Sequence, residues 1–213
     1  MGIAIKCATI FPGNKNLKKP AINGAVNLFD DQTGQLSAVI DFHLVTKWKT
    51  AGDSILAAKL LARPNSRNIL ILGAGGVTPS IILGLRMIGV KKIIVSNRTK
   101  DKVLKLKERF SFIEVLNWGE TVKANAIINT TSVGLKKTDK IQLNNSLFTP
   151  DTFFYDVIYN PKETNFLKKA KNEGCIVQNG LMMFINQAAV AFKTWHNIMP
   201  KIDKNLIEFL QND

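Results

Sequence analysis

The chain has 213 residues, of which 46% are hydrophobic, and this is enough for one large domain or two small ones around a sizeable core. No uninterrupted apolar stretch approaches the roughly 20 residues of a membrane-spanning helix, so we expect no membrane partner. The formal charge of +13 is scattered over Lys- and Asn-rich segments without interleaved aromatic residues, which argues against a nucleic-acid partner and favours small anionic ligands.

Residues 1–6 lack the basic region, apolar stretch and cleavage site of a signal peptide, so we expect a cytoplasmic protein. Cys7 and Cys175 stand in apolar sequence surroundings without metal-ligand spacing, and both are predicted to be reduced structural thiols. His43 and His196 have no motif partners, so we expect no metal site.

The first segment of the chain, residues 1–62, has a different pattern from the rest. It contains a turn-rich stretch at residues 11–14 (Phe-Pro-Gly-Asn) and a hairpin-like stretch at residues 30–34 (Asp-Asp-Gln-Thr-Gly). Residues 46–61 have helical character, and residues 63–66 (Arg-Pro-Asn-Ser) are typical of a hinge. We predict that residues 1–62 form a partial substrate-binding or catalytic domain, a shortened α/β segment.

From Asn68 onward, short β-branched runs alternate with helix-like segments, a pattern typical of βαβ units around a parallel sheet. The predicted strands are residues 68–72, 92–96, 112–116, 126–129, 153–156 and 175–178. The predicted helices are residues 78–88, 100–109, 163–172 and 181–195, with Gly89 and Gly174 as C-terminal stops. We therefore predict an α/β fold with a Rossmann-type doubly wound parallel sheet over residues 63–179. The C-terminal helices, residues 180–213, are expected to pack back toward the first domain.

A glycine-rich turn follows the first predicted strand of this domain, with the sequence Gly73-Ala74-Gly75-Gly76. Gly73 permits a tight turn, Gly75 lets the backbone approach a pyrophosphate, and the next helix offers free N–H groups at its N-terminus. Thr78 stands at the position of the third glycine of the dinucleotide-binding pattern. The strand–turn–helix context predicts a dinucleotide-binding loop, and a purely structural turn is the alternative.

The end of the second predicted strand bears on the type of dinucleotide. An NAD-binding domain typically places an acidic residue there, where it binds the 2′-hydroxyl of the ribose. This chain has Asn97, Arg98, Thr99 and Lys100 instead. A guanidinium group can hold a 2′-phosphate that a carboxylate would repel, so NADP is favoured over NAD. A solvated turn is the alternative interpretation of Arg98 and Lys100.

Five motifs follow one another in the second part of the chain. They are Gly-Ala-Gly-Gly at residues 73–76, Asn-Arg-Thr at 97–99, Asn-Thr-Thr-Ser-Val-Gly at 129–134, Asp-Val-Ile-Tyr-Asn-Pro at 156–161, and Gly-Leu-Met-Met at 180–183 followed by Gln187. With these motifs, the chain from about residue 68 to residue 195 resembles the shikimate dehydrogenase family. The resemblance implies an NADP-dependent dehydrogenase that interconverts shikimate and 3-dehydroshikimate in aromatic amino-acid biosynthesis.

The same resemblance implies roles for individual residues. The cofactor would be held by the glycine loop with Val77, by residues 97–102 and by Thr130, with Ile158 and Gly180 beside the nicotinamide.

Two further residues, Tyr159 and Gln187, would contact the substrate according to the resemblance. Without it, Tyr159 is a loop aromatic packed by Pro161, and Gln187 is a polar residue on an otherwise apolar helix.

Oxidation of a secondary alcohol requires a group that takes the hydroxyl proton while the hydride leaves. Shikimate dehydrogenases use a lysine paired with an aspartate, and the resemblance implies Lys6 and Asp53 in these roles, with Asn27 as a substrate-binding residue. Lys6 is equally interpreted as a surface lysine at a strand edge, and Asp53 as an acid on a helix face. The family's Ser-x-Ser substrate loop and Thr-x-Pro-Phe-Lys context are absent, and the segment before the Rossmann domain is about half the usual length, so we expect incomplete substrate binding.

Four stretches of the first segment share a second pattern, at residues 11–14, 28–34, 46–51 and 60–64. In them the chain resembles the ornithine cyclodeaminase and mu-crystallin family. This resemblance implies that Lys6 and Lys49 bind the carboxylate of an amino acid, and that the protein is a homodimer, because such proteins pair through their N-terminal domain. An enzyme acting on an amino acid and a non-catalytic NADPH-binding protein are therefore the alternatives to a shikimate dehydrogenase.

Overall fold

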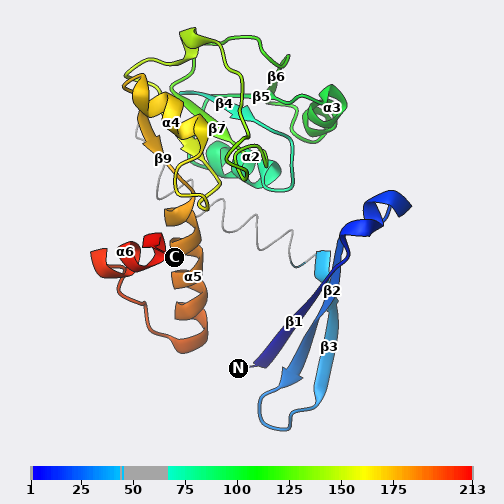
Figure 1. The fold of residues 1–213 in the computed structure, drawn as a ribbon. Helices are drawn as coiled ribbons and strands as arrows, with labels where there is room; N and C mark the ends of the chain where they lie inside the picture. The colour runs from blue at the N-terminus through cyan, green and yellow to red at the C-terminus, as the bar shows by residue number, and fades with distance from the viewer. Residues whose placement is uncertain (1, 44, 46–66, 213) are drawn as a thin grey trace. The chain divides into compact units, whose positions relative to one another are not determined.

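The computed structural model describes residues 2–43, 45 and 67–212. The chain divides into two compact units, Met1–Thr50 (the N-terminal unit) and Ala51–Asp213 (the C-terminal unit) (Figure 1). The predicted helix at residues 46–61, the predicted hinge at 63–66 and Asp53 lie outside the described residues. The predicted domain boundaries after residues 62 and 179, and the packing of residues 180–213 toward the first domain, stay predictions.

The described part of the N-terminal unit is a three-stranded antiparallel sheet in the order β1-β2-β3. Its strands are β1 (Gly2–Ile10), β2 (Ile22–Asp30) and β3 (Leu36–Asp41), and the 3-10 helix η1 (Pro12–Leu17) follows β1. The Asp30 carboxylate accepts hydrogen bonds from the backbone N–H groups of Gln32 and Thr33, at 3.0 and 2.7 Å. These bonds close the turn between β2 and β3, as the hairpin-like sequence at residues 30–34 predicts.

Few side chains of this sheet are buried. Among the described residues of the N-terminal unit, Val26 and Phe42 are the buried hydrophobic ones, whereas Ile3, Ile5 and Val39 are about half exposed or more. Cys7, in β1, is a free cysteine and is exposed, whereas Cys175 is free and buried.

The C-terminal unit is built on a six-stranded parallel sheet in the order β6-β5-β4-β7-β8-β9. The strands are β4 (Asn68–Leu72), β5 (Lys92–Ser96), β6 (Glu114–Leu116), β7 (Ala126–Asn129), β8 (Phe153–Asp156) and β9 (Ile176–Gln178). The direction of winding reverses between β4 and β7, and this reversal opens a crevice at the carboxyl ends of the strands. The predicted Rossmann-type α/β fold is confirmed.

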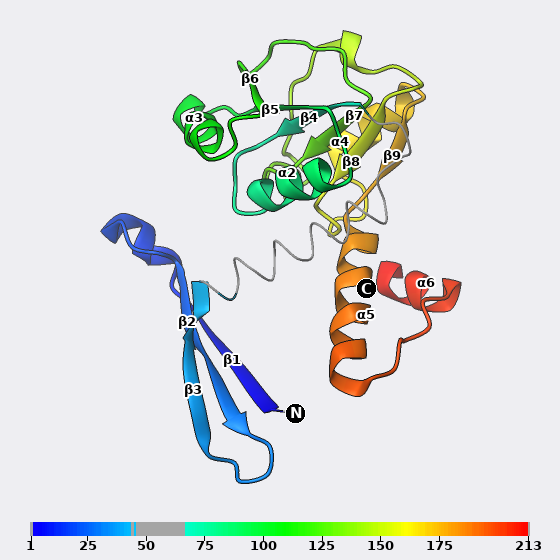
Figure 2. The ribbon, with the colours of Figure 1, turned by 180° about the vertical axis from the view of Figure 1, so that it is seen from behind.

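Two buried clusters lie on opposite faces of the parallel sheet because successive side chains of a strand point to opposite faces. Ile69 and Ile71 of β4 belong to one cluster, and Leu70 and Leu72 to the other. The helices of the unit are α2 (Thr78–Met87), α3 (Lys100–Arg109), α4 (Asn165–Asn172), α5 (Leu181–His196) and α6 (Lys204–Asn212), with the 3-10 helix η2 (Asn145–Leu147) before β8. Apolar residues of α2 and α3 join the first cluster and those of α4 join the second, so helices cover both faces (Figures 1 and 2).

The elements depart from the predicted bounds at five places, one of which is α2, which ends at Met87, one residue before the predicted end. Strands β6 and β9 are shorter than predicted because they form the two edges of the sheet and pair on one side only. Helix α4 begins at Asn165 because the Thr164 side chain accepts a hydrogen bond from the Leu167 N–H group and caps the helix there. Helix α5 extends to His196, and Asn197 ends it in the left-handed conformation.

Helix α2 ends before Gly89, and α4 ends before Gly174, as predicted, and both glycines have positive φ. None of the helices that the structure describes has the length and apolar character of a membrane span.

Candidate functional site

A cleft of about 640 Å³ lies at the carboxyl ends of the parallel strands. It is lined by four loops, which follow β4, β5, β6 and β7. The lining residues are Gly73, Ala74, Gly75, Gly76, Asn97, Arg98, Thr99, Lys102, Trp118, Thr130, Thr131, Ser132, Val133, Lys140, Ile141 and Gln142. The cleft thus brings together the predicted glycine loop, the predicted basic turn and Thr130.

The glycine loop passes close to the end of β7, and its first glycine is required there. Gly73 has a φ of +117°, which side chains of L residues rarely tolerate, and a Cβ atom at this position would lie 2.5 Å from Thr130 Oγ1. A Cβ atom at Gly76 would meet no atom of the described residues within 4 Å, and both Gly75 and Gly76 are exposed. The loop therefore presents bare backbone to the cleft.

A pair of buried hydroxyl groups ties this loop to β7. The Thr130 and Thr78 hydroxyl groups lie 2.8 Å apart, and either can donate to the other. The Thr130 hydroxyl lies 3.0 Å from the Leu72 carbonyl oxygen, and the Thr78 hydroxyl lies 3.4 Å from the Gly73 carbonyl oxygen. Thr78 is completely buried. Threonine at the position of the third glycine thus replaces close backbone packing with a hydrogen bond between α2 and β7.

The N-terminus of α2 has the electrostatic character of an anion site. Its first turn carries no acidic residue, and the N-cap residue, Val77, makes no side-chain hydrogen bond to the helix. The helix dipole therefore favours a negative group near Gly75 and Gly76. The Thr78 and Ser80 N–H groups donate to the Gly75 and Val77 carbonyl oxygens, and Pro79 has no N–H group. Val77 itself is not among the residues that line the cleft.

The turn after β5 supplies the basic side of the cleft. Asn97, Arg98, Thr99 and Lys102 line it, and the Asn97 amide nitrogen donates to the Thr99 carbonyl oxygen at 2.9 Å, which fixes the turn. Lys100 begins α3 and does not line the cleft. The lining residues within the described part of the chain include no acidic side chain, so the cleft suits a phosphate rather than a free ribose hydroxyl.

A buried polar network organises the loops after β7 and β8. The carboxylate of Asp156, which is fully buried, accepts hydrogen bonds from Thr164 Oγ1 at 2.7 Å, from the Ile158 N–H at 3.0 Å and from Asn129 Nδ2 at 3.0 Å. Burial raises the pKa of Asp156, and these three hydrogen bonds oppose the shift. Asn129 in turn accepts from the backbone and the hydroxyl group of Thr131, so one network fixes both loops.

Ile158 and Gly180, predicted to lie beside a nicotinamide, are neighbours in the structure. Both are buried, and the Gly180 N–H donates to the Ile158 carbonyl oxygen at 3.1 Å. A Cβ atom at Gly180 would collide with the Val157 carbonyl group. They lie at the ends of β8 and β9 and do not line the cleft described above.

The two residues predicted to contact substrate in this unit are Tyr159, in the loop after β8, and Gln187, in α5. Tyr159 is exposed and stacks on Phe184 with ring centroids 4.9 Å apart. Gln187 lies three residues beyond Phe184 on the same helix and is half-buried. The hydroxyl group of Tyr155, on β8, is buried without a hydrogen-bond partner among the described residues, and burial raises its pKa.

The residues predicted in the N-terminal unit lie on its sheet. Lys6 is exposed on β1, with its Nζ atom 4.6 Å from the centroid of the Phe42 ring. Asn27 is half-buried on β2, opposite Ile5. Because Asp53 lies outside the described residues, the predicted pair of Lys6 and Asp53 stays a prediction.

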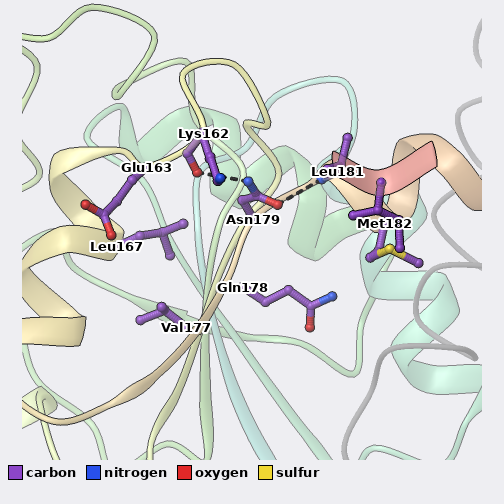
Figure 3. A pocket seen from close by; sticks show the side chains of 9 residues that line it. Lys162, Glu163, Leu167, Val177, Gln178, Asn179, Leu181 and Met182 are labelled. Carbon is purple, nitrogen blue, oxygen red and sulfur yellow. Dashed lines mark hydrogen bonds between the residues drawn. The ribbon is translucent and has the colours of Figure 1, made fainter. Parts of the chain in front are cut away.

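A second pocket, of about 490 Å³, lies at the other edge of the sheet, where β9 meets α4, α5 and α6. Its lining mixes the charged Lys162 and Glu163 with apolar side chains such as Leu167 (Figure 3). The Asn179 side chain links two parts of this lining. Its Nδ2 donates to the Lys162 carbonyl oxygen at 2.9 Å, and its Oδ1 accepts from the Leu181 N–H at 3.2 Å. These bonds position the first turn of α5.

Two parts of the cleft lining were missed by the sequence analysis. Trp118 follows β6, and its position after a strand of a parallel sheet is the signal that could have found it. Lys140, Ile141 and Gln142 belong to the long connection between β7 and β8, which has no periodic pattern that points to the cleft.

The comparisons with known proteins give the same two resemblances as the sequence motifs. The sequence model of the ornithine cyclodeaminase/mu-crystallin family matches residues 2–140. A shikimate dehydrogenase (NADP(+)) of Pelagibacter ubique is 53% identical over 145 residues, which are 68% of this chain and 55% of that protein. The chain spans about half the length of the curated relatives it matches.

Solved structures agree with the fold. The shikimate dehydrogenase of Aquifex aeolicus has 36% sequence identity and a TM-score of 0.64, with 83% of this chain and 62% of that chain covered. The enzyme of Thermus thermophilus in complex with NADP(H) and shikimate has 32% identity and a TM-score of 0.62, with coverage of 72% and 58%. The two predicted resemblances are confirmed.

Proposed function

Because the chain belongs to the ornithine cyclodeaminase/mu-crystallin family and its C-terminal unit is similar to shikimate dehydrogenases, we propose that it binds NADP in the cleft of that unit. One observation carries the proposal: the glycine loop that precedes α2 and the cations of Arg98 and Lys102 line a single cleft. A pyrophosphate fits the bare backbone at Gly75 and Gly76, and a 2′-phosphate fits the basic turn.

The proposed reaction is that of shikimate dehydrogenases, the reversible oxidation of shikimate by NADP to 3-dehydroshikimate and NADPH. The cofactor supplies hydride transfer when it is bound. Ile158 and Gly180 are proposed to border its nicotinamide, since their loops are fixed by the Asp156 network and by the hydrogen bond between them. Tyr159, from the loop after β8, and Gln187, from α5, are proposed to contact the small anionic substrate, together with Asn27.

A proton must leave the substrate hydroxyl group as the hydride leaves its carbon. We propose that the Lys6 amine accepts it and that Asp53 orients this lysine. The Lys6 Nζ atom lies over the Phe42 ring, 4.6 Å from its centroid, and this contact positions the amine on the sheet.

The test is a spectrophotometric assay with NADP and shikimate, which follows the absorbance of NADPH. Turnover is expected with the unaltered protein, and its loss is expected in Lys6→Ala while NADPH still binds. Binding of NADPH without turnover by the unaltered protein would contradict the catalytic part and leave the binding part standing. No binding of NADPH would contradict both.

The match of residues 2–140 to the ornithine cyclodeaminase/mu-crystallin family supports a second candidate, an enzyme that acts on an amino acid or a non-catalytic NADPH-binding protein. Release of proline and ammonia from ornithine would identify the former. Cofactor binding that Lys6→Ala leaves unchanged, together with no turnover of shikimate or ornithine, would identify the latter.

The proposed partners are a small anionic acid and a second copy of the chain, without nucleic acid or membrane, and the proposed location is the cytoplasm. The scattered distribution of the +13 charge supports a small anionic ligand. Light scattering on the purified protein tests the homodimer, and a monomeric mass would contradict it.

A further inference from the structure

Trp118 is held at the rim of the cleft by a tight turn that follows β6. The Glu120 N–H donates to the Asn117 carbonyl oxygen at 3.2 Å, and Gly119 has a φ of +91°. The Glu120 carboxylate accepts hydrogen bonds from Asn117 Nδ2 at 2.7 Å and from the Asn117 N–H at 3.1 Å. Both bonds lower the pKa of Glu120, so this clamp persists in its ionised form at neutral pH. The turn fixes the backbone on both sides of Trp118.

The indole ring is half-buried. It packs against the buried cluster that contains Leu72 and Ile94, and it also lines the cleft. Ile141 does the same from the connection between β7 and β8. The ring is therefore anchored in the core, and together with Ile141 it forms an apolar wall of the cleft.

The order of the strands gives the place of this wall along the cleft. Trp118 follows β6, Arg98 follows β5, and the glycine loop follows β4, the third strand from that edge. Neighbouring strands lie about 4.8 Å apart, so Trp118 lies roughly 10 Å from the glycine loop, on the side of Arg98. A dinucleotide with its pyrophosphate at the glycine loop and its 2′-phosphate at Arg98 extends its adenine in this direction.

We propose that Trp118 is the residue of this chain against which the adenine ring of the cofactor packs. The proposal rests on the proposed function, and it separates two tasks in the cleft. Trp118 contributes affinity for the base, whereas Arg98 contributes the preference for a 2′-phosphate. A flat aromatic surface suits a purine because every base has a π-face that can stack on it.

The experiment measures the binding of 2′,5′-ADP and of 5′-AMP by calorimetry, since neither carries a nicotinamide. Trp118→Ala is expected to weaken both ligands by roughly tenfold or more, the usual size of a base-stacking contribution. Trp118→Phe is expected to retain most of the affinity. Arg98→Gln is expected to weaken 2′,5′-ADP and leave 5′-AMP nearly unchanged.

Two controls separate stacking from packing. Trp118→Leu keeps an apolar side chain against the core but removes the aromatic face, and it is expected to bind as weakly as Trp118→Ala. Phe112→Ala removes an exposed aromatic residue near β6 that does not line the cleft, and it is expected to bind normally. Thermal unfolding of each variant checks that the cleft is folded.

The tryptophan fluorescence gives a second readout. Bound 2′,5′-ADP is expected to quench the emission of the unaltered protein, and this quenching is expected to be absent in Trp118→Phe at saturating ligand. Normal affinity of the folded Trp118→Leu variant would overturn the role of Trp118. Failure of the unaltered protein to bind 2′,5′-ADP would instead overturn the proposed cofactor site.

Discussion

In the C-terminal unit, successive side chains of β4 enter two separate buried clusters, whereas in the N-terminal unit the strands leave Ile3, Ile5 and Val39 exposed. The parallel sheet is covered by helices on both faces, so the loops that form the cleft are anchored to a core of their own. The three-stranded sheet contributes little apolar burial, and sheets of this size are stable mainly through what packs on them. The difference separates the proposed cofactor cleft, which has a core of its own, from the described part of the proposed substrate segment, where few side chains are buried.

The largest expected effect on stability is that of a large side chain buried in the C-terminal unit. Phe154 is fully buried on β8 and stacks on Phe148 with ring centroids 4.9 Å apart, so Phe154→Ala is expected to lower the free energy of unfolding by about 3–5 kcal/mol. Val39, on β3, is 62% exposed, and Val39→Ala is expected to change the free energy of unfolding by less than about 0.5 kcal/mol. Urea unfolding measures the stability of both variants. Similar losses of unfolding free energy in the two variants would contradict the difference between the two units.

The polar network of the C-terminal unit is the second point of difference. Asp156→Asn places an amide nitrogen among three donors in a buried site, so it is expected to cost about 2 kcal/mol of unfolding free energy. Asp151→Asn, at an exposed position before β8, is the matched control and is expected to have almost no effect.

The same variant has a pH signature. Because burial raises the pKa of Asp156, the folded chain binds this proton more tightly than the unfolded chain, and the contribution to stability falls as pH rises from the unfolded-state pKa through the folded-state pKa. Asp156→Asn is expected to lose this dependence. If the unfolding free energies of the unaltered protein and of Asp156→Asn changed with pH in parallel, the raised pKa of Asp156 would be contradicted.

The strained glycine gives the third prediction. Gly73→Ala forces a side chain into a positive-φ conformation against Thr130, so we expect a loss of about 2 kcal/mol of stability and weaker NADPH binding. Gly13→Ala, in the N-terminal unit, meets no atom of the described chain within 4 Å and serves as the control. Normal NADPH affinity of a folded Gly73→Ala variant would contradict the role of the loop.

The smallest effect is expected at Tyr155. Its hydroxyl group is buried without a hydrogen-bond partner among the described residues, so Tyr155→Phe removes an unsatisfied polar group and is expected to leave stability within about 0.5 kcal/mol or raise it. A loss well above that value in thermal or urea unfolding would mean that the hydroxyl group has a partner in solution.

The central strands of the parallel sheet were predictable because their sequences are uniformly apolar. The bounds of β4, β5, β7 and β8 match the sequence prediction, since each of these strands is covered on both faces. The edge strands β6 and β9 were predicted too long, because a local apolar run does not show where pairing on one side ends.

The site was predictable where it depends on local backbone geometry and not where it depends on distant loops. The glycine loop and the Asn97-Arg98-Thr99 turn follow directly from strands, and the structure brings them into one cleft. Trp118 and Ile141 join that cleft through tertiary packing. The Thr78 hydroxyl group contacts the hydroxyl group of Thr130, which lies 52 residues further along the chain. The position of Trp118 after a strand of a parallel sheet points to this edge, but no spacing in the sequence predicts the contacts of Ile141 and Thr78.

The central claim is that the cleft of the C-terminal unit binds NADP through its glycine loop and its basic turn. Calorimetric titration of the full chain with NADPH and with NADH tests it most directly. We expect the unaltered protein to bind NADPH at least about tenfold more tightly, and Arg98→Glu to abolish this preference because a carboxylate repels the 2′-phosphate. Equal affinities of the unaltered protein for the two cofactors, or binding of neither, would contradict the claim.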